Sequence, residues 1–222
     1  KAAHEADYDF ISEDGIGHTV WVVSDKATVD NITKLFDEKV PATYIADGHH
    51  RAASGAKVRE ALVAEGTADD RSNYFVTCIF PDTQLLIQDY NRVVTDLKGM
   101  SNDEFINALK NDFEVSEPMG KNQYKPAQLH EFGLYIGSNW YKLTAKEGTY
   151  TKDPIGILDV SILQNNVLTK LLDINDPRTD TRVDFVGGIR GLGELEKRVD
   201  SGNMAAAFAC YAVSIQQLFD IA

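Results

Sequence analysis

The stretch TYIADGHHRAASGAK, residues 43–57, constrains the fold more than any other part of the chain. An apolar run that ends at Ala46 predicts a short strand, and the alanine-rich run that starts near His49 predicts a helix. Asp47 and Gly48 lie between them and favour a turn. A strand, a tight turn and a helix in this order direct several unpaired backbone N–H groups, and the positive end of the helix dipole, at one point. Such a point attracts anions.

The residue types at this turn suit phosphate chemistry. Gly48 has no side chain to obstruct a phosphate, and Arg51 can hold phosphate oxygens through two N–H groups. His49 and His50 add ring donors that can become charged near neutral pH. Asp47 would repel a phosphate unless a metal ion or a substrate hydroxyl lay between them, so its presence favours phosphate transfer over phosphate storage.

A purely structural role fits the same letters. Asp is common at helix N-caps and Asp-Gly is common in turns, so Asp47 could simply cap the helix. Consecutive histidines project about 100° apart on a helix, so we expect no metal ion bound jointly by His49 and His50. The chain lacks G-x-x-x-x-G-K-[ST] and G-x-G-x-x-G, and GGIRGLG (187–193) predicts a turn before a helix.

Strand-like and helix-like segments alternate along the rest of the chain, and the hairpins imply antiparallel pairing. We therefore predict an α+β fold, a mixed sheet with interleaved helices. The expected strands are 17–25, 42–46, two within 73–94 joined at Pro81 and Asp82, a hairpin over 132–146 that turns at Gly137–Asn139, 181–188 and 204–213. The expected helices are 27–39, one from near His49 to Gly66, 101–113, 156–172, 193–202 and 214–222.

We expect residues 1–222 to form a single α+β unit, with a soft subdomain boundary near 99–121, where the composition turns polar. The first residue is not methionine, so we also expect the chain to be a fragment of a longer protein.

Acidic composition limits the partners. The chain has 34 acidic and 22 basic residues, a formal charge of −12, which repels nucleic acids and anionic membranes. No apolar run is long enough to cross a bilayer. Cys78 and Cys210 lie in apolar runs, where we expect buried thiols and hence a reducing compartment. We predict a cytoplasmic protein with a small-molecule partner, no nucleic-acid or membrane partner, and an oligomeric state that stays open.

YIADGHHR resembles the signature of a largely uncharacterised bacterial and archaeal family that carries I-A-D-G-H-H-R. The resemblance extends to HTVWVVSD, NYFVTCIFPD, NRVV, DPRTDTRVDFVGG and AAAF, nearly the whole chain. D-G-H-H-R is similar to the phosphate-binding turn of the ParB/sulfiredoxin-like fold, whose members include nucleotide-binding partition proteins, sulfiredoxins and free-serine kinases. The resemblance implies that Asp47 lies beside the transferred phosphoryl group, and that residues 48–51 hold the donor phosphates. It also makes Arg92 of NRVV a phosphate-binding candidate.

The stretch DPRTDTRVDFVGG (176–188) places Arg178, Asp180, Arg182 and Asp184 at period two. On a strand this spacing gives one face of alternating charge, which fits an exposed ladder of weak ion pairs. The alternative is that Arg178 or Arg182 binds a phosphate or a substrate carboxylate.

These features predict a small-molecule kinase that transfers a phosphoryl group from ATP, ADP or pyrophosphate to a hydroxyl such as that of free serine. Asp47 and His50 are the catalytic candidates, and Mg²⁺ is a candidate cofactor. The alternative is a non-catalytic, nucleotide-binding regulatory module of ParB-like type. DNA binding conflicts with the net charge of −12.

Overall fold

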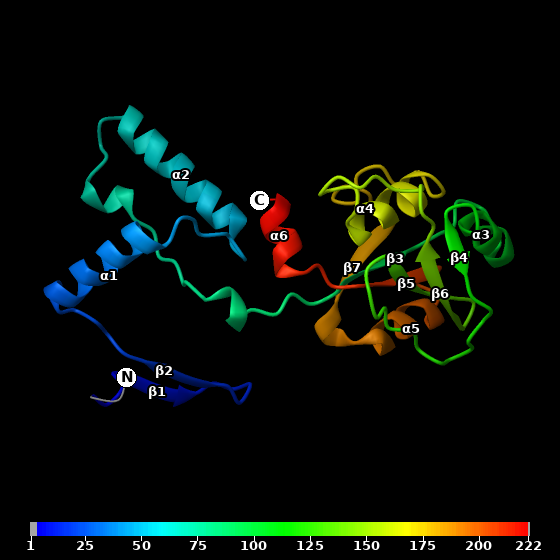
Figure 1. Cartoon of the computed structure of the whole chain (residues 1–222), viewed down its shortest axis with the longest axis horizontal. Helices are drawn as coiled ribbons and strands as arrows, with labels where there is room; N and C mark the ends of the chain where they lie inside the picture. The colour runs from blue at the N-terminus through cyan, green and yellow to red at the C-terminus, as the bar shows by residue number, and fades with distance from the viewer. Residues whose placement is uncertain (1–3, 222) are drawn as a thin grey trace. The chain divides into compact units, whose positions relative to one another are not determined.

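A computed structural model describes residues 4–221 of the chain. The chain divides into two compact units, Lys1–Phe75 and Val76–Ala222 (Figure 1). The stretch 99–121, where we expected a soft boundary, lies inside the second unit. Within residues 4–221, no helix combines the length and apolar character that crossing a membrane requires.

The first unit contains a two-stranded antiparallel hairpin followed by helices. Its elements are β1 (Tyr8–Ile11), β2 (Gly17–Val20), α1 (Lys26–Lys39), α2 (His49–Ala64) and the 3₁₀ helix η1 (Asp70–Asn73). α1 begins after Asp25, whose carboxylate accepts a hydrogen bond of 2.9 Å from the Thr28 N–H. Both helices start within one or two residues of the predicted positions, because their N-terminal signals are local.

Two predicted strands of this unit are wrong in length or type. The strand expected over 17–25 ends at Val20, where its ladder with β1 ends at the pair Tyr8–Val20. Residues 42–46 form no strand and belong to neither of the two described sheets. Apolar alternation predicts the extended backbone, but a ladder needs a neighbour as well.

The second unit is built on a six-stranded sheet in the order β4-β6-β5-β8-β3-β7. Every pair of neighbours in it is antiparallel. Its strands are β3 (Tyr90–Val94), β4 (Phe113–Val115), β5 (Glu131–Ile136), β6 (Asn139–Ala145), β7 (Val183–Gly187) and β8 (Ala206–Cys210). Its helices are the 3₁₀ turns η2 (Asp82–Gln84) and η4 (Gly188–Arg190), the helices α3 (Asn102–Leu109), α4 (Asp159–Leu163), α5 (Leu192–Asp200) and α6 (Ile215–Ile221), and the π-helical η3 (Gln164–Thr169). The predicted α+β class is confirmed, whereas the sheet is antiparallel throughout and not mixed.

Alternation along the strands produces two cores, one on each face of this sheet. On β5, Phe132, Leu134 and Ile136 join the larger core, whereas Tyr135 joins the smaller one. The larger core is covered by apolar side chains of α3, α4 and η3: Phe105, Leu109, Ile162, Leu163, Val167 and Leu168. α5 covers the other face through the buried Leu195.

Four details from residue 73 onward correct the prediction. Residues 73–81 form no strand, since they have no pairing partner among the described residues, so Cys78 is exposed rather than buried, while Cys210 is buried as expected. Only Tyr90–Val94 of the predicted pair of strands over 73–94 forms one. The helix expected over 156–172 begins at Asp159 and widens into η3. β7 begins at Val183, so Arg178 and Asp180 lie in the preceding turn and not on a strand face.

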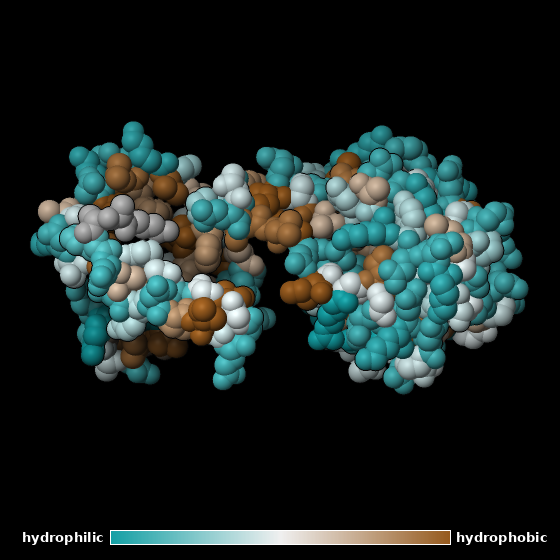
Figure 2. Space-filling view, turned by 90° about the horizontal axis from the view of Figure 1, so that it is seen from below, coloured by the Kyte–Doolittle hydropathy of each residue, from teal (hydrophilic) through white to brown (hydrophobic). Residues whose placement is uncertain are grey.

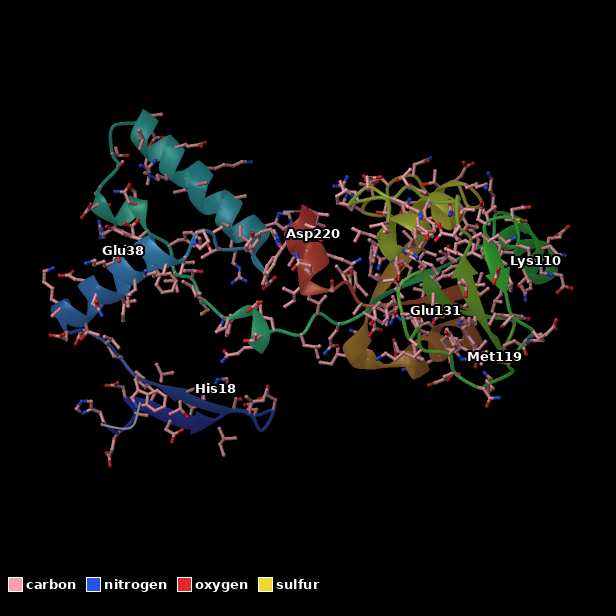
Figure 3. All side chains as sticks on the ribbon, viewed as in Figure 1. His18, Glu38, Lys110, Met119, Glu131 and Asp220 are labelled. Atoms are coloured by element: carbon pink, nitrogen blue, oxygen red, sulfur yellow. The ribbon has the colours of Figure 1, made fainter. Side chains whose placement is uncertain are left out.

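Burial differs sharply between the two units. None of the described residues of β1, β2, α1, α2 and η1 is buried, whereas all six residues of β5 are. Apolar side chains of the first unit are therefore in solvent, and Figure 2 shows hydrophobic residues on its outside. His18, labelled in Figure 3, illustrates this: its ring stacks on Phe10 with centroids 5.0 Å apart, and both residues are exposed.

Candidate functional site

The start of α2 carries the predicted anion-binding turn. Gly48 is the N-cap, with φ 82° and ψ 26°, and no side chain caps the helix. The first backbone N–H of this helix to donate within the described residues is that of Ala52, to the Gly48 oxygen at 2.9 Å. The N–H groups of His49, His50 and Arg51 precede it and have no acceptor within residues 4–221. Three adjacent donors at the positive end of a 16-residue helix are therefore available to an anion.

Asp47 does not cap the helix. Its Oδ2 accepts a hydrogen bond from Arg51 Nη2 at 3.2 Å, one helical turn further on. Both side chains face solvent, with 92% of Asp47 and 81% of Arg51 exposed. The structural alternative, a capping aspartate, is therefore not what the turn contains, and the carboxylate is held beside the guanidinium instead.

Gly48 keeps the turn open. Its φ of 82° lies in the left-handed region that glycine adopts without strain. A Cβ added at this position would lie 3.2 Å from both Nε and Nη2 of Arg51. Because Gly48 has no side chain, the Arg51 guanidinium can lie close to the backbone at the start of the helix. Its positive charge is therefore near the free N–H groups.

His49 and His50 occupy the first two positions of α2 and are both exposed. Among residues 4–221, no group of three or more His, Cys, Asp or Glu side chains is arranged to hold a metal ion. Asp47 is the only carboxylate in 43–57. A Mg²⁺ ion at this turn would therefore depend on the donor's phosphate oxygens for most of its ligands, with Asp47 as the protein ligand.

The other three predicted site residues belong to the second unit. Arg92 lies on β3 and is half-buried. Arg178 bonds to Asp176 through Nε at 3.0 Å, and this partner raises the pKa of the guanidinium.

Arg182 is tied into the turn before β7. Its Nη2 bonds to Asp180 at 2.7 Å and its Nη1 donates to the Leu172 oxygen at 2.9 Å. Arg178 and Arg182 thus form local ion pairs with Asp176 and Asp180. This agrees with the first interpretation, a set of weak ion pairs, and not with arginines that are free to bind a ligand.

Asp159 is a buried carboxylate that the pattern did not single out. It is 2% exposed, and Oδ1 accepts a hydrogen bond of 2.8 Å from the His130 N–H. Oδ2 is a buried side-chain atom with no partner among the described residues. Burial raises the pKa of this carboxyl to about 6. The signal in the sequence is a single acid inside the apolar run GILDVSIL.

Glu131, labelled in Figure 3, is a buried acid of the opposite kind. It accepts hydrogen bonds from Tyr124 at 2.5 Å and Gln128 at 3.1 Å, and it pairs with Lys142. Burial raises the pKa of this carboxyl, but the donors outweigh burial and lower it to about 2. Glu131 is therefore a charged group that holds β5 to its neighbours.

The glycines of GGIRGLG form the turn before a helix, as the spacing predicts. Gly188–Arg190 make the 3₁₀ turn η4, and α5 follows at Leu192. A cavity of about 330 Å³ adjoins this turn. Its lining residues are Asp89, Gln123, Lys125, Gly188, Gly191 and Leu192.

Comparison with known proteins assigns a family. Residues 1–161, about three quarters of the chain, match the model of the family described as protein of unknown function, DUF1015. The chain belongs to this family. No curated protein and no solved structure matches it.

Proposed function

We propose that this protein binds phosphate groups at the start of α2 and acts as a small-molecule kinase of the ParB/sulfiredoxin-like type. The donor is ATP, ADP or pyrophosphate, and the acceptor is a hydroxyl such as that of free serine. The proposal rests on the three free backbone N–H groups of residues 49–51, with Arg51 beside them and Asp47 paired to it. We also propose a cytoplasmic protein whose partners are small molecules rather than nucleic acids or membranes.

The residues of the turn divide the work of phosphoryl transfer. The N–H groups after Gly48 and the Arg51 guanidinium bind the phosphoryl oxygens and stabilise charge that develops on them. Asp47 accepts the proton of the acceptor hydroxyl, whose oxygen forms the new P–O bond as the donor's bridging P–O bond breaks. His50 donates to the leaving phosphate oxygen. A bound Mg²⁺ would neutralise the donor's charge, with Asp47 as its protein ligand.

Three arginines of the second unit are further binding candidates. We propose Arg92 as a residue that binds phosphate, and Arg178 and Arg182 as residues that bind a substrate carboxylate. The ion pairs with Asp176 and Asp180 must open for Arg178 and Arg182 to reach a ligand.

A coupled assay with free serine and each of the three donors tests the kinase. Phosphoserine is expected with at least one donor, and the rate should fall at least about a hundredfold in Asp47→Asn, the usual scale for loss of a general base. Asp69→Asn is the matched control, because Asp69 is another aspartate of the first unit paired to an arginine, at 2.6 Å. If none of the three donors yields phosphoserine, the kinase proposal fails.

The second candidate is a nucleotide-binding module without catalysis. The exposure of Asp47 favours it, because a side chain 92% in solvent is not shielded from water as a catalytic base usually is. Calorimetric titration with ATP decides between the two. Binding without turnover that survives Asp47→Asn and disappears in Arg51→Gln supports the binding module.

A further inference from the structure

One face of the β3–β7 pair holds an arginine in contact with two aromatic rings. The guanidinium carbon of Arg92 lies 5.3 Å from the ring centroid of Tyr90 and 5.2 Å from that of Phe185. The two rings stack on each other with centroids 5.2 Å apart and an angle of 9° between their planes. Arg92 also donates to the Tyr90 carbonyl oxygen. Its side chain is therefore fixed in direction by the strand itself and by the rings.

No acid among residues 4–221 forms an ion pair with this arginine. Within residues 4–221, six of the other seven arginines have a carboxylate oxygen within 4 Å. The seventh, Arg59, bonds to the side chain of Asn73. Arg92 has no carboxylate of the described residues within that distance. In a chain of net charge −12, a half-buried arginine without an acid is a cation with donors to spare.

The surface beside Arg92 has an open position. Tyr90 pairs with Gly187, and Arg92 pairs with Phe185, so these four residues share one face of the β3–β7 ladder. A Cβ added at Gly187 would meet nothing within 4 Å. Tyr90, opposite this glycine, is 53% exposed. The surface over Gly187 is therefore open, with the Tyr90 ring opposite it and the Arg92 guanidinium on the same face, and we call this open space the notch.

The acids nearest to the notch on β3 and β7 belong to the other face of the sheet. Asp184 occupies the other face of β7, where it pairs with Arg198 at 2.6 Å. Asp89 bonds to the buried Asn91, which alternates with Arg92 on β3. The charge that β3 and β7 themselves present to a ligand in the notch is therefore that of Arg92.

We propose that Tyr90, Arg92, Phe185 and Gly187 form a binding site for a small organic anion, one that joins a phosphate or carboxylate to a planar apolar group. The anionic group binds the guanidinium of Arg92, and the planar group lies in the notch over Gly187 against Tyr90. This site lies wholly in the second unit and goes beyond the phosphate site of α2. The two proposals share Arg92 alone, and the kinase proposal rests on residues 47–51, so binding at the notch that persists in Arg51→Gln is tested separately from the kinase.

The test uses the whole ¹⁵N-labelled chain and two probes, phenyl phosphate and inorganic phosphate. Saturable shifts of the amide resonances of Tyr90, Phe185 and Gly187 report binding at the notch, independently of events at α2. Phenyl phosphate should bind there at least about fivefold more tightly than inorganic phosphate, because its ring is removed from water. Arg51→Gln should leave these shifts unchanged, since Arg51 belongs to the other unit.

Two variants address the two parts of the site. Arg92→Gln should weaken phenyl phosphate at least about tenfold by removing the cation. Gly187→Val fills the notch without touching the arginine and should abolish the preference for phenyl phosphate; the φ near −63° at this residue permits valine. Arg71→Gln is the control for loss of an arginine. If the resonances do not move, if the two probes bind equally, or if Arg92→Gln binds like the unaltered chain, the proposal is overturned.

Discussion

Replacing glycine by alanine should have opposite effects on helix stability at Gly48, the N-cap of α2, and at Gly55 inside α2. Gly48 has a φ of 82°, and an added Cβ would approach Arg51 to 3.2 Å, whereas a Cβ at Gly55 would meet nothing within 4 Å. Gly48→Ala should destabilise the start of the helix by about 1 kcal/mol, the usual penalty for a left-handed alanine. Gly55→Ala should stabilise the helix by about 0.5–1 kcal/mol, because alanine loses less backbone entropy there.

The ¹³Cα chemical shifts of α2 measure both effects in the intact chain. Helical shifts should weaken at residues 49–51 in Gly48→Ala and strengthen around residue 55 in Gly55→Ala. Equal changes in the two variants would contradict the left-handed backbone at Gly48.

Asp159 predicts an unusual pH dependence of stability. Its pKa is raised by burial from 3.8 in the unfolded chain to about 6 in the fold, so ionisation is harder in the folded state. The destabilisation is therefore complete above pH 6 and disappears as the pH falls towards 4, and it amounts to about 3 kcal/mol from a shift of this size. Glu131 has the opposite effect, because its folded-state pKa of about 2 lies below the unfolded value of 4.5. Its ionised form stabilises the fold, and this stabilisation is lost only as the pH falls below 4.5.

Asp159→Asn isolates this effect, because the amide oxygen can still accept the His130 N–H. In urea unfolding the variant should exceed the unaltered chain in stability by about 2–3 kcal/mol at pH 8 and match it near pH 4. Parallel pH profiles for the two chains would show that Asp159 is not the titrating group.

At the scale of elements, α3 is defined by a reciprocal cap. The hydroxyl of Ser101 accepts from the Glu104 N–H at 3.3 Å, and the Glu104 carboxylate accepts from the Ser101 N–H at 2.8 Å. These bonds lower the pKa of Glu104. Ser101→Ala should destabilise the second unit by about 1 kcal/mol, since one helical N–H loses its acceptor. Urea unfolding measures it, and Ser201→Ala, at the C-terminal end of α5, serves as a control expected to have a smaller effect.

Elements whose signals are local could be predicted from the sequence. Ser101 marked the start of α3, and the Gly137–Asn139 turn marked the β5–β6 hairpin. The strands expected at 42–46 and 73–81 did not form, because strand pairing depends on a partner strand that apolar alternation does not identify.

The same limit applies to the candidate site. The turn residues predicted that the helix starts at His49. They did not predict that the Asp47 carboxylate accepts a hydrogen bond from Arg51 instead of from a backbone N–H. Nor did the pattern place Arg92 beside two stacked rings, since Tyr90 and Phe185 are far apart in sequence.

At the scale of the whole molecule, the two units differ in what holds them together. The described cores consist of residues 93–210, whereas β1, β2, α1 and α2 bury no residue. Hydrogen exchange of the intact chain should therefore be slowest in β5, β6 and β8 and at least about a hundredfold faster in α1 and the β1–β2 hairpin. Comparable protection in α1 and β5 would show that the first unit has a core that its burial pattern does not indicate.

The central claim is that backbone N–H groups at the start of α2 bind a phosphate, and a pyrophosphate titration of the ¹⁵N-labelled chain tests it most directly. We predict saturable shifts of the His49, His50 and Arg51 amide resonances, weakened at least about tenfold in Arg51→Gln and retained in Gly55→Ala. Resonances of these three amides that stay in place at saturating pyrophosphate would contradict the claim.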